Sequence, residues 1–418
     1  LVDADALPLL RRYVDGMNST IIPSLMDELQ RPAVSDAESG ELLPVESQKK
    51  LATQRVEKQA NDVRRRAMAA AWLFRLGKSE FVWPLLKKQP DASLRYALID
   101  RIRLVGGDIG PVLSQLKLVA SEPLPETPTS VTDQHTELHT LLLLAGDLAT
   151  QMQDAQRTSA IPLIAGLFET HPDPSVHSSC EWALKQLGAT SKVHEIRKKP
   201  GAAPLVENRN WYITASGATM AVIRGPVDFY MGADWTDPDR LANDSVNPVT
   251  GEVTRSDEER YMQRTIPRDF AIGLKEVSLA EFLLFEKDFH EKINQFMSPT
   301  VDYPANKVNW YLAARYCNWL SEQEGLDVSE WCFIPDSEGR YGEGLTLAAN
   351  YLQRRGYRMP TEAEWEYACR AGTTTPRFFG HCRELFPQYV WYAENSKEQA
   401  LLVPGTLKPN ALGLFHVF

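Results

Sequence analysis

The chain has 418 residues, 43% of them hydrophobic and 24% charged, which is the composition of a globular protein with two or three domains. Its 55 acidic residues outnumber its 45 basic residues, so there is no basic field to collect the phosphates of a nucleic acid. No apolar stretch approaches the roughly 18 residues that a membrane-spanning helix requires. Wholesale disorder is therefore excluded, and we expect no nucleic-acid partner and no membrane span in this chain.

Both ends of the sequence resemble the ends of a fragment. The chain begins at Leu1 without a signal-peptide pattern, and it stops within the apolar run of residues 412–418 without a polar tail. We therefore expect a fragment, or a truncated reading frame, of a longer protein. The five cysteines are odd in number and include no C-x-x-C pair, so they predict neither a zinc knuckle nor a closed disulfide framework, and they leave the compartment open.

Residues 1–196 have helical periodicity, with apolar positions three and four residues apart and loops marked by Pro and Asp. The sequence PDASLR at residues 90–95 recurs as PDPSVH at residues 172–177, and a third copy is expected midway, at residues 137–139 before the leucines of 141–144. A period of about 41 residues is typical of two-helix HEAT-type repeats. We predict a short, all-α HEAT-like solenoid, and the alternative is an irregular helical bundle.

A linker and a second domain follow the helical region. Residues 197–208 combine charge, two prolines and small residues, so we place the domain boundary there. Residues 209–418 change to short strands, aromatic residues and many Gly and Pro, which predicts an α+β domain. Strands are expected at residues 220–225 and 227–232, separated by a Gly-Pro turn, and at residues 266–272.

Three helices of this domain have recognisable first turns. Ser278 with Glu281, and Thr361 with Glu364, form capping boxes, and Asn309 can cap the helix between them. The apolar spacing predicts the buried faces of the three helices in turn: Leu279, Phe282 and Leu283; Ala313, Tyr316, Cys317 and Leu320; Trp365, Ala368 and Cys369, with Gly372 closing the last helix.

The densest motif of the domain is GYRMPTEAEWEYACRAG at residues 356–372. Supporting motifs occur in order around it, at residues 220–232, 276–278, 308–310, 316–319 and 408–414. Together they resemble the formylglycine-generating enzyme family, also called the sulfatase-modifying factors, over about residues 205–418. The resemblance implies an irregular α+β fold related to C-type lectin domains, which opens with a hairpin at residues 220–232 and is C-terminally incomplete here.

The resemblance also implies a chemistry and a context. Active family members use molecular oxygen and a copper ion held by two thiolates to oxidise a peptide cysteine of a sulfatase to formylglycine, and soft thiolates select Cu(I). The family's two cysteines lie five positions apart, past the point that corresponds to Phe418, and no pair in this chain has that spacing. The copper ligands are therefore absent, and we assign no catalytic residue and predict no oxidase activity for these 418 residues. The pairing with a HEAT-like region resembles bacterial multidomain proteins of planctomycete type, in which a Ser/Thr kinase can lie upstream, but this chain carries no kinase motif.

The cysteines within the family motifs have a structural interpretation. Cys317 and Cys369 match family positions that form disulfides with C-terminal cysteines in secreted members, and those partners would lie beyond Phe418. Both fall on helix faces that we expect to be buried, where a free cysteine behaves as a small hydrophobe, so we interpret them as structural rather than catalytic. Cys332 and Cys382 match no role in the family.

Calcium is the other metal that the resemblance implies. Asn395 and Ser396 match its first site, where a side-chain oxygen and a backbone carbonyl suit a hard cation. The alternative for Asn395 is a turn residue. His416 stands where the second site begins with Asn or Asp, and because imidazole is a poor calcium ligand we expect that site to be lost.

Two further patterns are weighed and set aside. His135 and His139 have the i, i+4 spacing of metal ligands, but no Glu follows the first histidine and no third ligand is evident, so we interpret them as an exposed face of a helical repeat. Three arginines can line a groove if they converge: Arg224, Arg268 and Arg358.

Two functions remain open at this point. The first is an enzyme, in which the full-length protein or its ancestor is a formylglycine-generating oxidase that acts on a peptide or protein substrate. The second is a non-catalytic binding or sensory module, in which the lectin-like fold binds a peptide or glycan and the helical region recruits a protein partner, as in a kinase-linked signalling protein. The missing thiol pair is the feature that discriminates between them.

Overall fold

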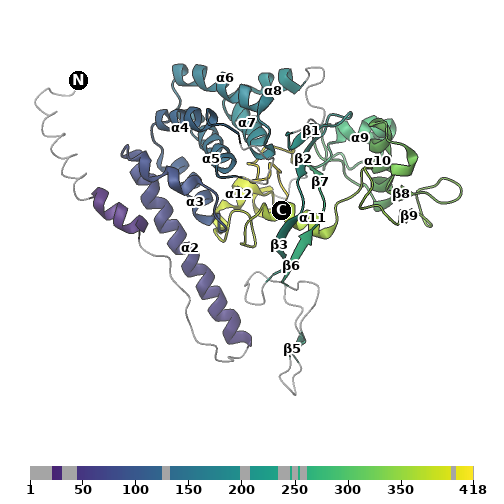
Figure 1. The fold of residues 1–418 in the computed structure, drawn as a ribbon, viewed down its shortest axis with the longest axis horizontal. Coiled ribbons are helices and arrows are strands. Elements are labelled where there is room, and N and C mark those ends of the chain that lie inside the picture. The colour runs from purple at the N-terminus through teal and green to yellow at the C-terminus, as the bar shows by residue number, and fades with distance from the viewer. Residues whose placement is uncertain are drawn as a thin grey trace, which may run out of the picture.

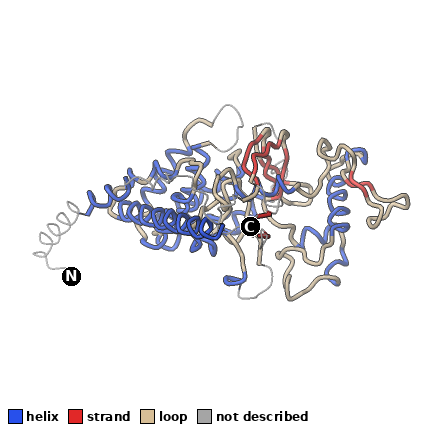
Figure 2. The backbone as a smooth tube through the Cα atoms, turned by 90° about the horizontal axis from the view of Figure 1, so that it is seen from below, coloured by secondary structure: helices blue, strands red, loops and turns tan. Residues whose placement is uncertain are grey.

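The structure, a computed structural model, describes residues 21–30, 45–124, 132–197, 208–233, 245–246, 253–254, 261–396 and 402–417. Most of the expected linker, residues 198–207, lies outside these ranges. The helices of the first half form one end of the molecule and the larger strands lie near its middle, as Figures 1 and 2 both show. Further helices of the second half form the opposite end.

The first half is helical, as predicted. After a helix at residues 21–30, its helices are α2 (Val45–Arg75), α3 (Ser93–Val105), α4 (Gly110–Ala120), α5 (Asp133–Asp147), α6 (Asp154–Thr170), α7 (Pro174–Gln186) and α8 (Thr190–Arg197), with short 3-10 turns at Ser79–Phe81, Trp83–Leu86 and Ala149–Gln151. Helix α2 packs on α3, α4 on α5, and α6 on α7, while α5 also packs on α7. The second helices of these pairs begin 40 and 41 residues apart.

The aspartate of the repeated motif starts a helix in both copies. Asp91 Oδ1 accepts a hydrogen bond from the Ser93 backbone N–H at 2.8 Å, and Asp173 Oδ1 accepts one from Ser175 at 2.9 Å. Each carboxylate satisfies a backbone donor that the first helical turn leaves without a partner. The local chemistry of the motif therefore accounts for the starts of α3 and α7.

The strands of the second half form small antiparallel sheets. A three-stranded sheet has the order β1 (Trp211–Ile213), β2 (Thr219–Ile223), β7 (Phe270–Gly273), while β3 (Val227–Met231) pairs with β6 (Met262–Ile266), β4 (Ser245–Val246) with β5 (Val253–Thr254), and β8 (Phe333–Ile334) with β9 (Thr346–Leu347). Ala221 of β2 fixes the register of the larger sheet, because it lies opposite Trp211 on one side and Ile272 on the other.

Two expectations about these strands are wrong. Strands β2 and β3 exist, but they join different sheets and do not form a hairpin. The single strand expected at residues 266–272 is interrupted at residues 267–269, where the chain turns between β6 and β7. Asp269 holds this turn against the one between β2 and β3, because its Oδ1 accepts a hydrogen bond from the Gly225 backbone N–H at 2.9 Å.

The first three helices of the second half begin as predicted, and two short ones follow them. They are α9 (Leu279–Phe285), α10 (Trp310–Gln323), α11 (Glu362–Arg370), α12 (Phe386–Tyr389) and α13 (Ala393–Ser396), with 3-10 turns at Lys287–Glu291, Val328–Glu330 and Arg383–Leu385. Both capping boxes are formed, and the Asn309 side chain accepts a hydrogen bond from the Leu312 backbone N–H.

The predicted inner face of α11 needs one correction. Ala368 and Cys369 are buried, but Trp365 is 50% exposed, whereas the neighbouring Glu364 is only 1% exposed. Glu364 turns inward because Arg268 and Arg358 both bind its carboxylate there. An ion pair between distant segments therefore overrides the apolar spacing of the helix.

The largest hydrophobic core joins the two halves of the chain. The Tyr96 ring of α3 packs edge-to-face on Phe378 and Tyr389, with ring centroids 5.4 and 5.3 Å apart. The C-terminal segment of residues 402–417, yellow in Figure 1, passes between the helices and the strands. Its Lys408 forms a buried ion pair with Asp147 of α5 at 2.6 Å. The sheets are thus positioned by direct packing on the helical half.

Candidate functional site

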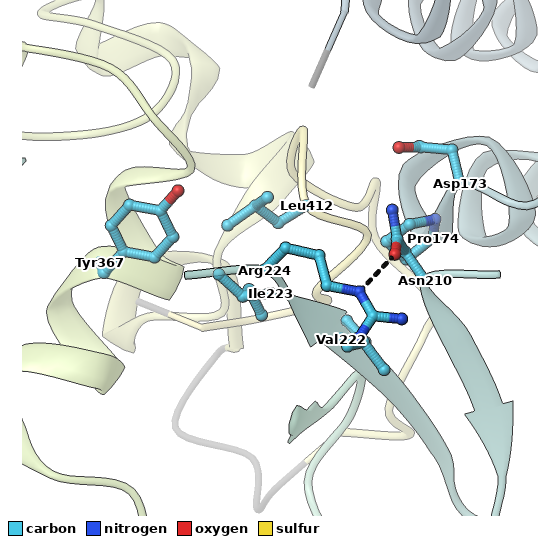
Figure 3. A pocket seen from close by; sticks show the side chains of 9 residues that line it. Asp173, Pro174, Asn210, Val222, Ile223, Arg224, Tyr367 and Leu412 are labelled. Carbon is cyan, nitrogen blue, oxygen red and sulfur yellow. Dashed lines mark hydrogen bonds between the residues drawn. The ribbon is translucent and has the colours of Figure 1, made fainter. Parts of the chain in front are cut away.

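A pocket opens at the joint between the two halves, where the start of α7 faces β2 (Figure 3). Its volume is about 370 Å³ when the part open to solvent is counted. The lining comes from five separate stretches of the chain: Asp173, Pro174, Asn210, Ala221, Val222, Ile223, Arg224, Tyr367 and Leu412. No local motif joins these stretches, so sequence reasoning alone missed the pocket.

Arg224 and Tyr367 line this pocket from different elements (Figure 3). Arg224 Nε donates a hydrogen bond to Asn210 Oδ1 at 3.1 Å, and its Nη1 donates one to Asp269 Oδ2 at 2.9 Å. Burial raises the pKa of the Tyr367 phenol, so this hydroxyl stays protonated at neutral pH. The pocket therefore presents hydrogen-bonding groups but no activated nucleophile.

Asp173 is the anionic group of the pocket lining. Its Oδ1 accepts hydrogen bonds from the N–H groups of Ser175 and Val176 at 2.9 and 3.2 Å and from the Ser175 hydroxyl. Its Oδ2 lies 3.2 Å from His135 Nδ1. Burial opposes ionisation, but His135 and Ser175 outweigh it and hold the pKa of Asp173 well below its usual range. The ionised carboxylate therefore caps the N-terminus of α7.

The three arginines considered for a groove do not converge. Arg268 and Arg358 both bind Glu364, with Nη2 to Oε1 distances of 2.7 Å, whereas Arg224 binds Asp269. Burial opposes ionisation of Glu364, but Arg358 and Arg268 lower its pKa to about 2. Each of the three arginines therefore forms an ion pair within the fold, and they do not line a common groove.

The prediction that His135 and His139 form an exposed helix face is wrong. Both lie on α5, where they are 4% and 0% exposed. His171, which precedes α7, packs edge-to-face on His135, and Tyr96 of α3 packs edge-to-face on His139, so this face of α5 is internal. His139 Nδ1 lies 2.7 Å from the Ser179 hydroxyl of α7. Among the residues that the structure describes, no group of three His, Cys, Asp or Glu side chains is arranged to hold a metal ion.

Asn395 and Ser396, the candidate calcium ligands, lie together in α13. The Asn395 Oδ1 accepts a hydrogen bond from the Tyr392 backbone N–H, and its Nδ2 donates one to the Val390 carbonyl, both at 2.8 Å. Through these bonds Asn395 holds the turn before α13, which is the alternative to calcium binding that the sequence left open. Calcium binding at this pair remains a prediction, for which the second lone pair of Oδ1 is the available donor.

His416, at the expected position of the second calcium site, is built into the fold. Its Nε2 accepts a hydrogen bond from the Leu407 backbone N–H at 3.1 Å. Burial, with the charges of Lys275 and Lys185, lowers the pKa of His416 to about 4. The imidazole is therefore neutral at pH 7 and serves to fold the C-terminal segment.

The thiols of the described residues are poor copper ligands. All five cysteines are free and buried. Burial raises the pKa of Cys317 and Cys369 to about 12 and that of Cys382 to about 11. Metal binding and redox chemistry need the thiolate, and these side chains are held as thiols. The Cys369 thiol donates to the Val417 carbonyl at 2.6 Å, which fits the structural role expected for it. The residues present do not fit a copper centre, and we derive no step through one.

A solvent-facing aromatic surface is the other feature that sequence reasoning missed. Trp310 and Tyr311 open helix α10 and are 45% and 39% exposed. The Trp310 ring packs edge-to-face against Tyr311 and against buried Phe333, with centroids 5.4 and 5.7 Å apart. Leu347, opposite Phe333 in the β8–β9 pair, is 42% exposed. We call Trp310, Tyr311 and Leu347 the aromatic surface.

The comparisons with known proteins identify one domain of the chain. Residues 229–418 match the family model of the sulfatase-modifying factor enzyme 1-like domain, FGE-sulfatase. A curated relative, "Chaperone protein LppX" from Paenibacillus barcinonensis, is 26% identical over 171 residues, which cover 40% of this chain and 59% of the relative. The chain thus spans less than two thirds of that relative's length. No solved structure matches. No helix of the described residues is both long and apolar enough to cross a membrane.

Proposed function

We propose that this chain, whose residues 229–418 form a sulfatase-modifying-factor domain, binds apolar segments of other polypeptides at its aromatic surface and does not oxidise them through the five thiols described. The observation that carries the proposal is the position of Trp310, which is held rigidly by Phe333 and Tyr311 yet faces solvent. A fixed aromatic side chain contributes a large contact area at little cost in conformational entropy, and Trp and Tyr dominate the energetics of protein interfaces.

The comparisons support a polypeptide as the ligand. The relative that aligns with this chain is named a chaperone protein, and chaperones bind polypeptides. The domain resembles enzymes whose substrates are peptides. The ligand that we propose for this chain therefore belongs to the same chemical class as the substrates of those enzymes. The buried state of all five thiols favours binding over catalysis in this chain.

The helical half has a supporting part in the proposal. Its helix pairs recur 40 and 41 residues apart, which supports a HEAT-like array. Such arrays present extended surfaces to protein partners, so we propose that this half recruits a second protein. Calcium bound at Asn395 and Ser396 would stabilise the turn after α12 and would not contact the bound polypeptide.

The Trp310→Ala variant tests this function. The probe is fluorescein-labelled, carbamidomethylated α-lactalbumin, an unfolded polypeptide without free thiols. We expect wild-type protein to bind it saturably and the variant to bind it at least about tenfold more weakly, because a central aromatic anchor contributes about 1.4 kcal/mol or more. Fluorescence anisotropy measures both dissociation constants.

The matched control is Trp72→Ala. Trp72 lies on α2 in the helical half and is 43% exposed, almost the same as Trp310. We expect its removal to leave the dissociation constant unchanged. Equal weakening by the two variants would show nonspecific adhesion to exposed tryptophan, and full binding by Trp310→Ala would contradict the proposal.

A further inference from the structure

Four histidines are buried together where the helical half meets the first strand of the sheet. His135 and His139 come from α5, His171 precedes α7, and His177 lies within α7; each is at most 6% exposed. We call these four residues the histidine cluster. The Nε2 atom of every member is buried and has no hydrogen-bond partner among the described residues. Such a concentration of unpaired polar atoms is unusual, because buried polar groups are almost always hydrogen-bonded.

His177 is the member that touches the sheet directly. Its ring is stacked between Phe168 and Trp211, with centroid distances of 4.3 and 3.8 Å. Its Nδ1 lies 2.9 Å from the Phe168 carbonyl, so this nitrogen carries the proton and Nε2 presents a bare lone pair. A proton added at Nε2 would become a buried N–H with no acceptor.

Trp211 also connects β1 to the loop before α7. Its Nε1 donates a hydrogen bond to the His171 carbonyl at 2.8 Å, and the Asn210 backbone N–H donates one to the Pro172 carbonyl at 2.9 Å. The other face of the Trp211 ring is available to the Arg209 guanidinium, which lies 4.7 Å from the ring centroid. These two bonds and the stacked His177 ring join β1 to α7 and to the loop before it.

Burial opposes protonation of three members, and the charges around them act in both directions. The groups that face the cluster are Arg95 from α3, Asp173 before α7, Glu181 from α7, Arg197 from α8, Arg209 before β1 and Lys275 after β7. Burial and Arg95 lower the pKa of His139 to about 3, and burial, Arg197 and Lys275 lower that of His177 to about 3. Burial lowers the pKa of His171 to about 4, although the Asp173 carboxylate acts against it.

We propose that the histidine cluster makes this joint sensitive to acid, so that protonation releases the Trp211 segment from α7 before the sulfatase-modifying-factor domain of residues 229–418 unfolds. The free imidazole binds a proton near pH 6.5, and only the opened joint exposes it to water. A group whose pKa is lower in the closed state stabilises that state at neutral pH, and the stabilisation is lost as the pH falls below 6.5. This inference is independent of the polypeptide-binding proposal.

Hydrogen–deuterium exchange tests the proposal on the whole chain. For His177 alone, a shift from 6.5 to about 3 raises the opening equilibrium about 25-fold between pH 7 and pH 5. We expect amides of residues 209–213 to show an increase of at least this size, after correction for the intrinsic exchange rate. Amides of α10, which contacts no member of the cluster, serve as the internal reference and should show a much smaller change.

His177→Phe keeps a stacking ring but cannot take up a proton. We expect it to lower the pH response of residues 209–213 about 25-fold, whereas His194→Gln, at an exposed position of α8, should leave the response unchanged. If His177→Phe does not fold, the wild-type comparison of residues 209–213 with α10 decides the question alone. An equal pH response in these two segments, or a full response in folded His177→Phe, would overturn the proposal.

Discussion

Replacing Glu181 by glutamine is expected to lower the free energy of unfolding by about 3 kcal/mol, because it leaves three cations without their shared anion. Glu181 lies on α7 and is 1% exposed. Its carboxylate binds Lys275 and Lys185 through Oε1 at 2.6 and 2.7 Å, and Arg197 through Oε2 at 2.7 Å. Lys275 follows β7, so the same side chain ties the sheet to the helical half.

The matched control is Glu195→Gln, at an ion pair on the surface. Its Lys192 partner is 2.9 Å away, but both side chains are largely exposed. We expect this change to cost no more than about 0.5 kcal/mol. Urea denaturation followed by near-ultraviolet circular dichroism measures both values. Equal effects of the two variants would contradict the assignment of Glu181 as the centre of a buried ion-pair cluster.

The ionisation of Glu181 gives this cluster a pH dependence. Burial opposes the charge, but Arg197, Lys275 and Lys185 outweigh it and hold the pKa of Glu181 well below its usual range. A carboxyl group with a lowered pKa stabilises the folded state above its unfolded pKa, near 4.3, and this contribution is lost as the pH falls. The stability difference between wild type and Glu181→Gln should therefore shrink in acid below about pH 4.

Replacing Gly413 by alanine is expected to be the other strongly destabilising change, at about 3 kcal/mol or more. The backbone φ of Gly413 is +85°, in the left-handed region, and a Cβ there would lie 2.4 Å from the Pro174 carbonyl oxygen. The Pro174 oxygen belongs to the backbone and a Cβ is fixed to its own backbone, so neither can move aside as a flexible side chain would. The clash should push the C-terminal segment off the start of α7.

The Gly217→Ala variant separates the cost of the left-handed backbone conformation from the cost of the clash with Pro174. Gly217 has a similar φ of +91°, but a Cβ there would meet nothing within 4 Å. We expect a cost of about 1–2 kcal/mol from the left-handed conformation alone. Comparison of the two melting temperatures isolates the contact with Pro174. If both variants lose the same stability, the close packing between the C-terminal segment and α7 is not a feature of the folded protein.

Local chemistry predicted the starts of helices well. The caps at Ser278, Asn309 and Thr361, and the aspartates that begin α3 and α7, all act within a few residues of their own position. Such interactions are encoded in short stretches of sequence, so they can be recognised without knowing the fold. The resemblance to the sulfatase-modifying factors likewise located a domain that the family comparison supports.

Pairings between distant segments could not be predicted in the same way. Strand β2 pairs with β7 and β3 with β6, although the paired strands lie about 30 to 50 residues apart in the chain, whereas sequence reasoning expected neighbouring strands to form a hairpin. Glu364 was assigned no inward role because its two arginine partners, Arg268 and Arg358, are brought to it only by the fold.

The environment of the candidate site residues likewise depends on contacts between distant segments. The buried environment of His135 and His139 is created by residues that lie 30 or more positions away in the chain, with His171 packed on His135 and with Tyr96 and Ser179 beside His139. A helical spacing of two histidines describes their common face but not whether another element covers it. The aromatic surface was missed because the exposure of Trp310 depends on the packing of β8 and β9 beside α10.

The central claim is that polypeptides bind at the aromatic surface, and a hydrogen-exchange footprint tests it most directly. Wild-type protein is labelled with and without saturating carbamidomethylated α-lactalbumin at pH 7. If polypeptides bind at the aromatic surface, we expect slower exchange at residues 309–312 and 346–348 and no protection on α2. Protection confined to α2 or to the pocket beside Asp173, or no protection anywhere at saturation, would contradict the account.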